Sequence, residues 1–414
     1  MIPITAEILT VGTEILLGNI VNSNAAFLSQ ELAKLGIAVY THTSVGDNHG
    51  RLAAAMGQAM GRADIVITTG GLGPTLDDIT KPVAADFFGL EMEIHAASHE
   101  RILERYKGRA LPENVERNAL VPKGASVLPN DNGAAPGICI ERDGKTLIML
   151  PGPPYEMQPM FKNYGVALLK KNATRVFVSR TIKIIGMGET AVESQLRDLI
   201  EAQENPTIAP YAKLGEVHIR LTASAADESA ANALLSPTAE EIHRRLGEKI
   251  YAEDETTLAE TIIALLKSKS HTLAVAESCT GGMISSDLTA IAGCSEILRE
   301  GFVTYSNEAK TARLSVGESI LQAHGAVSAQ TAAAMAEGAA KAANTTIGLS
   351  TTGIAGPDGG TAEKPVGTVH IGLYIEGEGT KTVSHHLTGQ RNEVRKRTAI
   401  LALDFLRLNL RTMP

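Results

Sequence analysis

The chain has 414 residues, with 38 Lys and Arg against 46 Asp and Glu and a formal net charge of −8. This mildly acidic balance lacks the basic footprint that a general nucleic-acid binder needs, so we expect no direct nucleic-acid partner. With 44% hydrophobic and 20% charged residues, the composition is that of a globular protein rather than a disordered one. At about 150 residues per domain, the length predicts two or three domains.

The start of the sequence and its cysteines indicate in which cellular compartment the protein is expected. The first basic residue is Lys34, and residues 4–11 have a strand pattern, so no signal peptide is predicted. No apolar run approaches the roughly 18 to 20 residues of a membrane span. Three scattered cysteines build neither a disulfide framework nor a zinc site, and they fit a reducing compartment. We expect a cytoplasmic protein without a membrane partner.

Residues 1–170 alternate between strand and helix patterns. Leu28, Leu32 and Leu35 have the i, i+4, i+7 spacing of one helix face, and Gly36 follows them as a helix-ending glycine. The other elements predicted here are strands over 4–11, 37–45, 64–69, 138–141 and 146–150, a helix over 52–60, and a hairpin turn at Asp143-Gly144. This order predicts an α/β domain with a mainly parallel or mixed sheet.

Residues 171–252 have a different pattern and predict a small α+β, KH-like domain. Its predicted elements are strands over 180–185, 207–212 and 216–223, a helix over 189–201, and a long helix ending near Ile250. The loop Gly186-Met187-Gly188 lacks the GxxG pattern of a nucleic-acid module, and residues 171–255 hold 10 basic against 14 acidic side chains. We therefore interpret this domain as a spacer or a dimerisation domain, and we expect a homodimer.

The acidic run 252–255 predicts a linker, and residues 253–414 predict a second α/β domain. Apolar residues from Val394 to Leu408 alternate in spacings of four and three, which indicates one buried face of a final helix. The other predicted elements are a helix over 257–268, strands over 271–276, 301–305 and 347–352, a helix from Ser328, and a hairpin over 369–387.

Three loops of the first domain follow strands, where ligands bind in open α/β sheets. They contain residues 12–14, 68–78 and 151–156. Glycine N–H groups can cradle an anion, and carboxylates suit Mg²⁺. The candidates are Gly70, Gly71 and Gly73 for nucleotide binding, and Asp77, Asp78, Glu14 and Glu156 for a metal. The alternative is that the glycines only form turns and that Asp78 is a helix N-cap.

In the second domain, the strand over 271–276 leads into the sequence ESCTGG at residues 277–282. Ser278 lies between a buried strand and a glycine-started helix, the position of a hydrolase nucleophile. Free N–H groups at the start of that helix could stabilise an oxyanion. The motif is not GxSxG, which excludes an α/β-hydrolase.

A candidate base lies in the sequence YSNEAK, residues 305–310. We expect Tyr305 to end a strand, Asn307 to cap a helix and Lys310 to lie in its first turn. A general base at neutral pH needs a lysine pKa about 3 units below ~10.4, roughly 4 kcal/mol, whereas the helix dipole supplies about 0.3–1 kcal/mol. Burial must therefore supply most of the shift. The hypothesis is a Ser278–Lys310 dyad assisted by Tyr305, and the alternative is a solvated surface lysine.

Two more segments could contact a substrate. The loop TTGIAGPDGG, residues 351–360, is too rich in glycine for a plain turn, and its N–H groups and Thr352 could hold a phosphate or the reacting carbonyl. Arg391 opens the last helix and could grip a phosphate as a planar fork. For Arg395 and Arg397 we prefer an ordinary basic helix face.

For one cysteine and two pairs of histidines, the sequence favours structural roles over catalysis or metal binding. Cys279 is intrinsically more nucleophilic than its neighbour Ser278, but no histidine lies in these motifs, and His271 is about 20 Å away at ~3.3 Å per strand residue. We therefore interpret Cys279 as a packing residue. The pair His95 and His99 lacks an HExxH pattern and fits a solvated helix face. His385 and His386 alternate along a strand and cannot bind one ion.

These motifs together resemble a known family. GGLGPTLDD and PGPPYEM resemble the molybdopterin-binding domain of molybdenum-cofactor biosynthesis proteins, and more closely the N-terminal domain of the competence/damage-inducible protein CinA family. ESCTGG, YSNEAK, TGIAGPDGG and GQRNEVR resemble the C-terminal domain of the same family, which is similar to stand-alone nicotinamide-nucleotide amidohydrolases. The resemblance covers essentially the whole chain.

The resemblance implies hydrolysis of nicotinamide mononucleotide to nicotinic acid mononucleotide and ammonia without a cofactor. Ser278 would be the nucleophile, Lys310 the base and Tyr305 an assistant. The implied substrate-binding residues are Thr280, Gly281, Gly282, Thr352, Gly353, Gly356 and Arg391.

For the N-terminal domain, the resemblance implies hydrolysis of the pyrophosphate bond of ADP-ribose with Mg²⁺, Mn²⁺ or Co²⁺, together with K⁺. The alternative for the whole chain is a non-catalytic regulatory protein that binds a pterin or nucleotide and is linked to competence or DNA damage.

Overall fold

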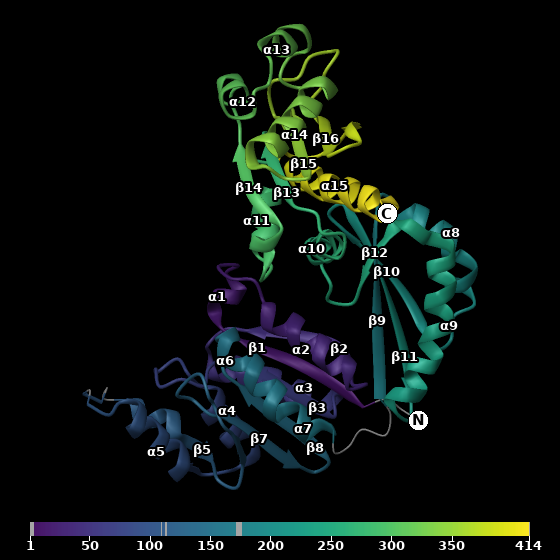
Figure 1. Cartoon of the computed structure of the whole chain (residues 1–414). Coiled ribbons are helices and arrows are strands. Elements are labelled where there is room, and N and C mark those ends of the chain that lie inside the picture. The colour runs from purple at the N-terminus through teal and green to yellow at the C-terminus, as the bar shows by residue number, and fades with distance from the viewer. Residues whose placement is uncertain (1–3, 109, 112–113, 171–175, 414) are drawn as a thin grey trace. The chain divides into compact units, whose positions relative to one another are not determined.

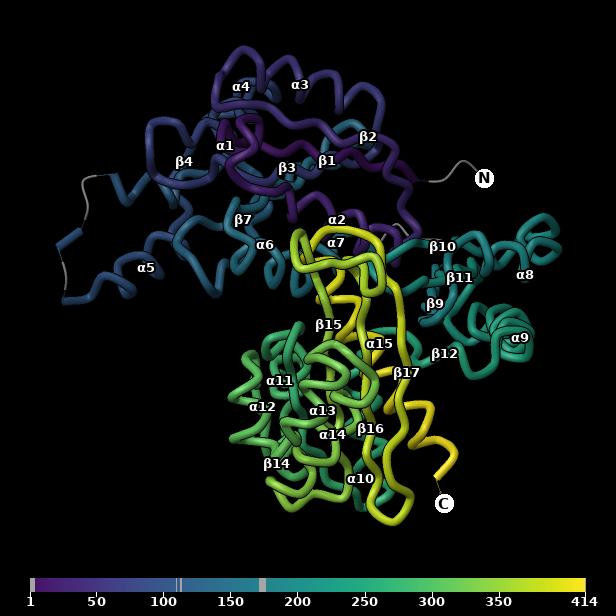
Figure 2. Tube along the Cα trace, turned by 90° about the horizontal axis from the view of Figure 1, so that it is seen from above, coloured from purple at the N-terminus to yellow at the C-terminus, as the bar shows by residue number. Residues whose placement is uncertain are grey.

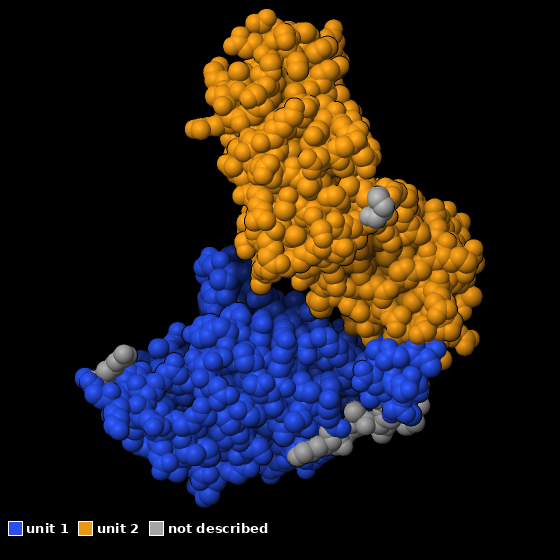
Figure 3. Space-filling model, in the orientation of Figure 1, with its two compact units in different colours: residues 1–178, 223–233 blue, residues 179–222, 234–414 orange. Residues whose placement is uncertain are grey.

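The computed structural model describes residues 4–108, 110–111, 114–170 and 176–413. The chain forms two compact units, residues 1–178 with 223–233 and residues 179–222 with 234–414 (Figure 3). The predicted start of the small domain, at residues 171–175, lies outside the described residues. Within the described ranges, no helix combines the length and the apolar character that crossing a bilayer requires.

The N-terminal sheet is mixed, with the strand order β2-β1-β3-β8-β7-β6. Its strands are β1 (Thr5–Val11), β2 (Ala38–Val45), β3 (Ile65–Thr69), β6 (Ser126–Leu128), β7 (Gly137–Arg142) and β8 (Lys145–Leu150). The first three strands and β8 pair in parallel, whereas β8, β7 and β6 pair antiparallel. The predicted hairpin is confirmed, because Asp143 and Gly144 between β7 and β8 have φ of 52° and 74°, as a type I′ turn requires.

Helices cover both faces of this sheet (Figure 1). The remaining elements are α1 (Thr13–Leu16), α2 (Ser23–Lys34), α3 (His49–Arg62), α4 (Thr80–Phe88), β4 (Met92–Ile94), α5 (Ala96–Arg105), a 3₁₀-helix (Val115–Ala119), β5 (Leu120–Pro122), α6 (Pro154–Met160), a π-helix (Phe161–Gly165) and α7 (Val166–Lys170). Ile8 packs with α2 and α6, and its neighbour Leu9 packs with α3 and α4, as strand alternation requires. Helix α3 is longer than predicted because Asn48 caps it and accepts a hydrogen bond from the Arg51 N–H.

The small sheet has the order β10-β11-β9-β12. Its elements are β9 (Val176–Ile185), α8 (Glu189–Glu201), β10 (Thr207–Lys213), β11 (Glu216–Ala225), α9 (Glu228–Leu246), a 3₁₀-helix (Gly247–Lys249) and β12 (Ile250–Glu253). Two expectations are wrong here. The long helix ends at Leu246 rather than near Ile250, and half of the predicted acidic linker belongs to β12, which pairs antiparallel with β9.

The C-terminal sheet has the order β14-β13-β15-β16-β17, and Figure 2 follows the chain through it. Its elements are α10 (Leu258–Ser268), β13 (Leu273–Glu277), α11 (Met283–Thr289), a 3₁₀-helix (Cys294–Glu296), β14 (Leu298–Val303), α12 (Asn307–Leu314), α13 (Glu318–His324), α14 (Ala329–Ala343), β15 (Ile347–Gly353), β16 (Thr368–Ile375), β17 (Gly379–His386) and α15 (Arg391–Thr412). Val275 packs with α10 and α15 on one face, and Ala274 packs with α12 and α14 on the other.

The parallel strands position the loops of the C-terminal sheet. β14, β13 and β15 run in the same direction, so their carboxyl ends meet at one edge. The loops that leave these ends begin at residues 278, 304 and 354. Ligands bind at this kind of edge in open α/β sheets, and the predicted motifs lie there.

Candidate active site

Ser278 and Lys310 meet at the carboxyl edge of the C-terminal sheet. Ser278 follows β13 directly, and its N–H donates to the Thr351 carbonyl at 3.0 Å, which extends the pairing with β15. Lys310 projects from the first turns of α12. Its Nζ lies 3.2 Å from the Ser278 Oγ, and the lysine is 1% exposed. This lysine is therefore not a solvated surface residue.

The surroundings of Lys310 suit an uncharged amine. Its Nζ contacts the carbonyl oxygens of Thr304 at 2.8 Å and Tyr305 at 3.4 Å. Burial lowers the pKa of Lys310, and no carboxylate in the described part of the chain forms an ion pair with it. A neutral amine has two N–H groups for the two carbonyls and one lone pair, which is then available to the Ser278 hydroxyl.

The local structure around Tyr305 differs from the prediction. β14 ends at Val303, so Tyr305 lies in the following loop, and Ser306 rather than Asn307 caps α12 by accepting from the Ala309 N–H. The loop turns the Tyr305 carbonyl toward the lysine, while its side chain is 65% exposed. The Tyr305 hydroxyl oxygen accepts from Arg391 at 3.2 Å, so this side chain extends toward Arg391 at the rim.

A cavity of about 240 Å³ joins seven of the predicted residues. These are Ser278, Lys310, Tyr305, Thr352, Gly353, Gly356 and Arg391. Arg391 Nη1 donates to the Gly356 carbonyl at 2.6 Å, and Thr352 donates its hydroxyl to the Ala326 carbonyl at 2.7 Å. Both side chains therefore brace the loops around the cavity in addition to lining it.

The other three predicted substrate-binding residues, Thr280, Gly281 and Gly282, do not line this cavity. The Thr280 hydroxyl is buried and lies 2.7 Å from the Thr351 hydroxyl. The structure thus gives Thr280 a packing role within the loop.

Glu277 corrects the prediction that the N–H groups at the start of α11 are free to stabilise an oxyanion. Its carboxylate, on a fully buried side chain, accepts from the N–H groups of Gly282 at 2.9 Å, Ile284 at 3.2 Å and Ser285 at 2.9 Å. The Ser285 hydroxyl donates to it as well, at 2.8 Å. The signal for this residue was a single acidic side chain at the end of the otherwise apolar strand LAVAE.

Arg395 corrects a second expectation, because it is more than part of a basic helix face. Its Nε donates to the Cys279 carbonyl and its Nη2 to the Thr280 carbonyl, each at 3.0 Å. Arg397, two residues further on, donates instead to the Thr388 carbonyl at 3.0 Å and does not reach this loop. The spacing of two arginines on one helix could not distinguish these two roles.

Cys279 lines the same cavity as Ser278. Burial raises the pKa of its thiol to about 12, so the thiolate that would act as a nucleophile is scarce at neutral pH. This environment favours Ser278 over Cys279 as the attacking group.

The N-terminal sheet has its own cavity, of about 650 Å³, and all seven predicted residues line it. They are Gly70, Gly71, Gly73, Asp77, Asp78, Glu14 and Glu156. Gly70 has φ of 107°, and a Cβ there would lie 2.1 Å from the Val11 carbonyl oxygen, so the close approach of this loop to the end of β1 requires glycine.

The carboxylates in this cavity are dispersed. Asp78 accepts from the Thr75 N–H at 2.9 Å, and Glu156 accepts from the Asn130 amide at 2.7 Å. Across the described ranges, no three His, Cys, Asp or Glu side chains form a group that could hold a metal ion. A metal here would therefore take some of its ligands from a bound phosphate or from water, as Mg²⁺ commonly does. Asp78 is also not an N-cap, since α4 begins at Thr80 after Ile79.

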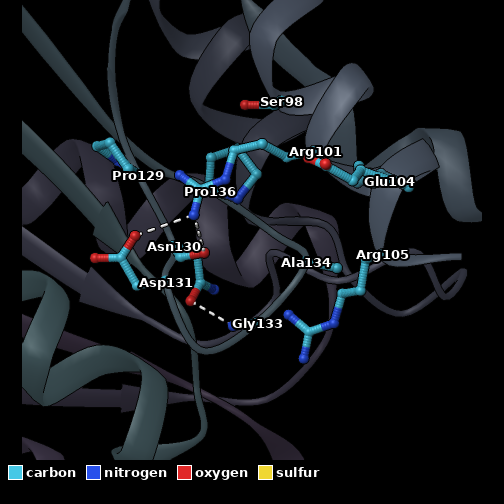
Figure 4. A pocket seen from close by; sticks show the side chains of 11 residues that line it. Ser98, Arg101, Glu104, Arg105, Pro129, Asn130, Asp131, Gly133, Ala134 and Pro136 are labelled. Atoms are coloured by element: carbon cyan, nitrogen blue, oxygen red, sulfur yellow. Dashed lines mark hydrogen bonds and ion pairs between the residues drawn. The ribbon is translucent and has the colours of Figure 1, made fainter. Parts of the chain in front are cut away.

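A further cavity of about 340 Å³ lies between α5 and the loop 129–136 (Figure 4). Arg101 donates to the Asn130 carbonyl at 3.2 Å and to Asp131 at 3.0 Å, so its charge is already paired. None of the predicted site residues lines this cavity.

The predicted histidine pair lies at the start of α5, with His95 just before the helix and His99 in its first turn. His95 caps this helix by accepting from the Ser98 N–H at 3.3 Å, and His99 lies 3.5 Å from Glu116. Neither histidine belongs to a metal-binding group in the part of the chain that the structure describes.

The fold and its cavities define a protein with two α/β parts, each with a cavity at strand ends, and a small α+β part that lies between them in the sequence. Three family models match these parts: "Probable molybdopterin binding domain" over residues 7–171, "Damage-inducible protein CinA KH domain" over 179–252, and "CinA C-terminal domain" over 255–410. A CinA-like protein of Dictyoglomus thermophilum is 50% identical over 406 residues, 98% of each chain. The chain belongs to the CinA family.

Other proteins are similar to this chain over all or part of its length. A CinA-like protein of Kosmotoga olearia is 49% identical over 97% of this chain and 98% of its own. Among solved structures, the protein CinA of unknown function from Thermoplasma acidophilum is 34% identical and covers 40% of this chain and 97% of its own, with a TM-score of 0.38. A competence/damage-inducible protein from Agrobacterium tumefaciens is 42% identical over 37% of this chain and 94% of its own, with a TM-score of 0.35.

Proposed function

We propose that the C-terminal cavity hydrolyses the carboxamide of nicotinamide mononucleotide, giving nicotinic acid mononucleotide and ammonia. The observation that carries this proposal is the 3.2 Å contact between the Ser278 hydroxyl and the buried amine of Lys310. Burial lowers the pKa of Lys310 and so favours the neutral amine, which can act as a base, and a serine beside a base is an activated nucleophile.

The first half of the reaction forms an ester on the protein. Neutral Lys310 takes the hydroxyl proton as the Ser278 Oγ attacks the amide carbon, which gives a tetrahedral intermediate. The amide C–N bond then breaks, and Lys310 returns its proton to the leaving nitrogen, so that ammonia departs. The serine is left as an acyl ester of the pyridine carboxylate.

The second half regenerates the serine. Lys310 is neutral again and takes a proton from a water molecule that attacks the ester carbon. The ester bond to the Ser278 Oγ then breaks, and the proton returns to this oxygen through Lys310. The sum is one amide and one water converted to one carboxylic acid and one ammonia.

The proposed substrate contacts follow from the charge of Arg391 and from its position beside Tyr305. Arg391 is a guanidinium at the cavity rim, with the Tyr305 hydroxyl 3.2 Å away. A guanidinium and a phenol together suit the phosphate of a mononucleotide, because both can donate to its oxygens. The phosphate would then lie at the rim, with the carboxamide directed toward Ser278.

Ammonia release from nicotinamide mononucleotide tests this function. Ser278→Ala should lower kcat about 10³-fold or more, because it removes the attacking oxygen. Ser286→Ala, an exposed serine one turn into α11, is the matched control and should keep full activity. Acid quenching of the wild type followed by intact mass measurement should reveal the acyl ester. A wild-type protein that releases no ammonia from this substrate would contradict the proposal and favour the non-catalytic regulatory alternative.

For the N-terminal cavity we propose a second activity, hydrolysis of the pyrophosphate bond of ADP-ribose with a divalent metal. The observation that favours it is the presence of Asp77 and Asp78 in one cavity with the three glycines. The two carboxylates would hold a metal together with phosphate oxygens, and the glycine N–H groups would bind the phosphates.

Asp77→Asn tests the second activity with Mg²⁺, Mn²⁺ or Co²⁺ and ADP-ribose. It should lower AMP formation about 10- to 100-fold, because the substitution removes a metal-binding charge. Asp86→Asn is the control, since Asp86 is exposed and pairs with His49 outside the cavity. Ammonia release at the C-terminal site should be the same in both variants. Unchanged AMP formation in Asp77→Asn would reject Asp77 as a metal ligand.

A further inference from the structure

The loop that carries Ser278 is held at both of its ends. At its start, the Ser278 N–H donates to the Thr351 carbonyl at 3.0 Å. At its end, the buried Glu277 carboxylate accepts from the N–H groups of Gly282 and Ser285, each at 2.9 Å. The loop therefore begins on a strand and closes back onto the residue before the serine.

Arg395 holds the middle of the same loop. One guanidinium binds the successive carbonyl oxygens of Cys279 and Thr280, each at 3.0 Å. Because a trans peptide unit is planar, fixing a carbonyl fixes the orientation of its whole peptide plane. Arg395 thus orients the two peptide planes that follow Cys279, next to the serine.

Arg395 is itself oriented by its own helix. Its Nη1 donates to the Asn392 side-chain oxygen at 3.1 Å. Arg391, one turn earlier on α15, binds the Gly356 carbonyl and the Tyr305 hydroxyl. Arg391 lines the cavity and Arg395 does not, so the two arginines have separate tasks.

We infer that Arg395 is a positioning residue for the amidase reaction. By fixing the loop that leads from Ser278 to α11, Arg395 keeps the Ser278 hydroxyl directed at Lys310. This inference rests on the proposed function of the C-terminal cavity. Because Arg395 acts through the loop rather than on the substrate, its loss should affect the chemical step and leave substrate binding almost intact.

The variant Arg395→Ala should lower kcat for ammonia release about 10- to 100-fold, since a displacement of about 1 Å can cost 10²-fold in rate, while KM changes less than about threefold. Millimolar guanidinium should restore part of the lost kcat. Arg395→Lys should recover little, because a point charge cannot form the planar two-carbonyl contact. Arg397→Ala, on the same helix but away from the loop, is the control and should behave as the wild type without and with guanidinium.

The outcomes separate this inference from the proposed function. If the wild type releases no ammonia, the proposed function fails. If the wild type is active and Arg395→Ala keeps its kcat, the positioning role is wrong. A raised KM with an unchanged kcat would make Arg395 a substrate contact instead. A lower kcat with a lower melting temperature and no guanidinium rescue would reduce Arg395 to general structural support, and it too would overturn the inference.

Discussion

The loop cluster around the N-terminal cavity and the loop cluster around the C-terminal cavity share two kinds of interaction, one made by an arginine and one made by a buried lysine. In each, an arginine binds two successive carbonyls of the functional loop: Arg117 donates to Pro74 at 3.2 Å and Thr75 at 3.0 Å, as Arg395 does to Cys279 and Thr280. In each, a lysine is buried against backbone carbonyls. The clusters differ in what else the lysine contacts.

Lys81 and Lys310 show this difference directly. Lys81 Nζ donates to the carbonyls of Arg117 at 2.8 Å and Asn118 at 3.2 Å, and burial lowers its pKa to about 8. Lys310 Nζ also contacts two carbonyls, but its third contact is the Ser278 hydroxyl. A lowered lysine pKa is therefore shared by both clusters, and of these two lysines it is Lys310 that also contacts a side-chain hydroxyl, the contact on which the proposed function rests.

The largest expected effect separates the two lysines. Lys310→Met should lower ammonia release about 10³-fold or more, whereas Lys81→Met should leave it within about twofold. In the wild type, kcat/KM should rise with pH up to the lowered pKa of Lys310, because the base is the neutral amine, and this rise should disappear in Lys310→Met. The measurement is the pH profile of ammonia release for the three proteins. Equal losses of ammonia release in both lysine variants would contradict the distinction between Lys310 and Lys81.

The variant Lys81→Met should also change how the free energy of unfolding depends on pH. The pKa of Lys81 is about 8 in the folded protein, below its ordinary value of 10.5, so the unfolded chain binds more protons between these two values. The free energy of unfolding should therefore rise with pH in this window, and Lys81→Met should remove that rise. Urea unfolding at pH 8 and pH 10 gives the comparison.

A smaller effect is expected at Glu277. Glu277→Gln keeps the size of the side chain but replaces an acceptor oxygen by an NH₂ group that faces N–H donors. The free energy of unfolding should fall by about 1–3 kcal/mol, the cost of leaving buried polar groups without partners. Glu300→Gln, at an exposed glutamate of the neighbouring strand β14, is the control and should change stability little. An unchanged unfolding midpoint in Glu277→Gln would show that the N–H groups at the start of α11 find other acceptors.

The sequence predicted the elements whose signals are local. The period of Leu28 and Leu32 located α2, the Asp143-Gly144 pair located a hairpin, and the strand pattern before Ser278 located β13 within two residues. The errors of these predictions lie at the ends of helices and strands, where a single capping side chain determines at which residue the element begins or ends. Ser306 rather than Asn307 caps α12 for this reason.

The interactions that shape the candidate site were harder to predict. That burial must lower the pKa of Lys310 followed from energetics, but the depth of that burial depends on segments distant in the sequence. Glu277 and Arg395 were missed because their partners are backbone N–H and carbonyl groups, which carry no sequence signal. Arg395 lies more than a hundred residues from the loop that it holds, so only the assembled fold brings them together.

Helix α15 also has a consequence for the order in which the site is completed during protein synthesis. Arg391 and Arg395 are translated after every loop that they hold, and those loops belong to strands that leave the ribosome earlier. Since domains generally fold as units, and Ala402 and Leu406 of α15 belong to the core that also contains Val275 of β13, the loops of Ser278 and Lys310 take their final positions together with this helix. A nascent chain interrupted ahead of residue 391 would thus lack part of the core beneath β13 as well as Arg391 of the cavity wall, so the cavity is completed only after this helix has been made.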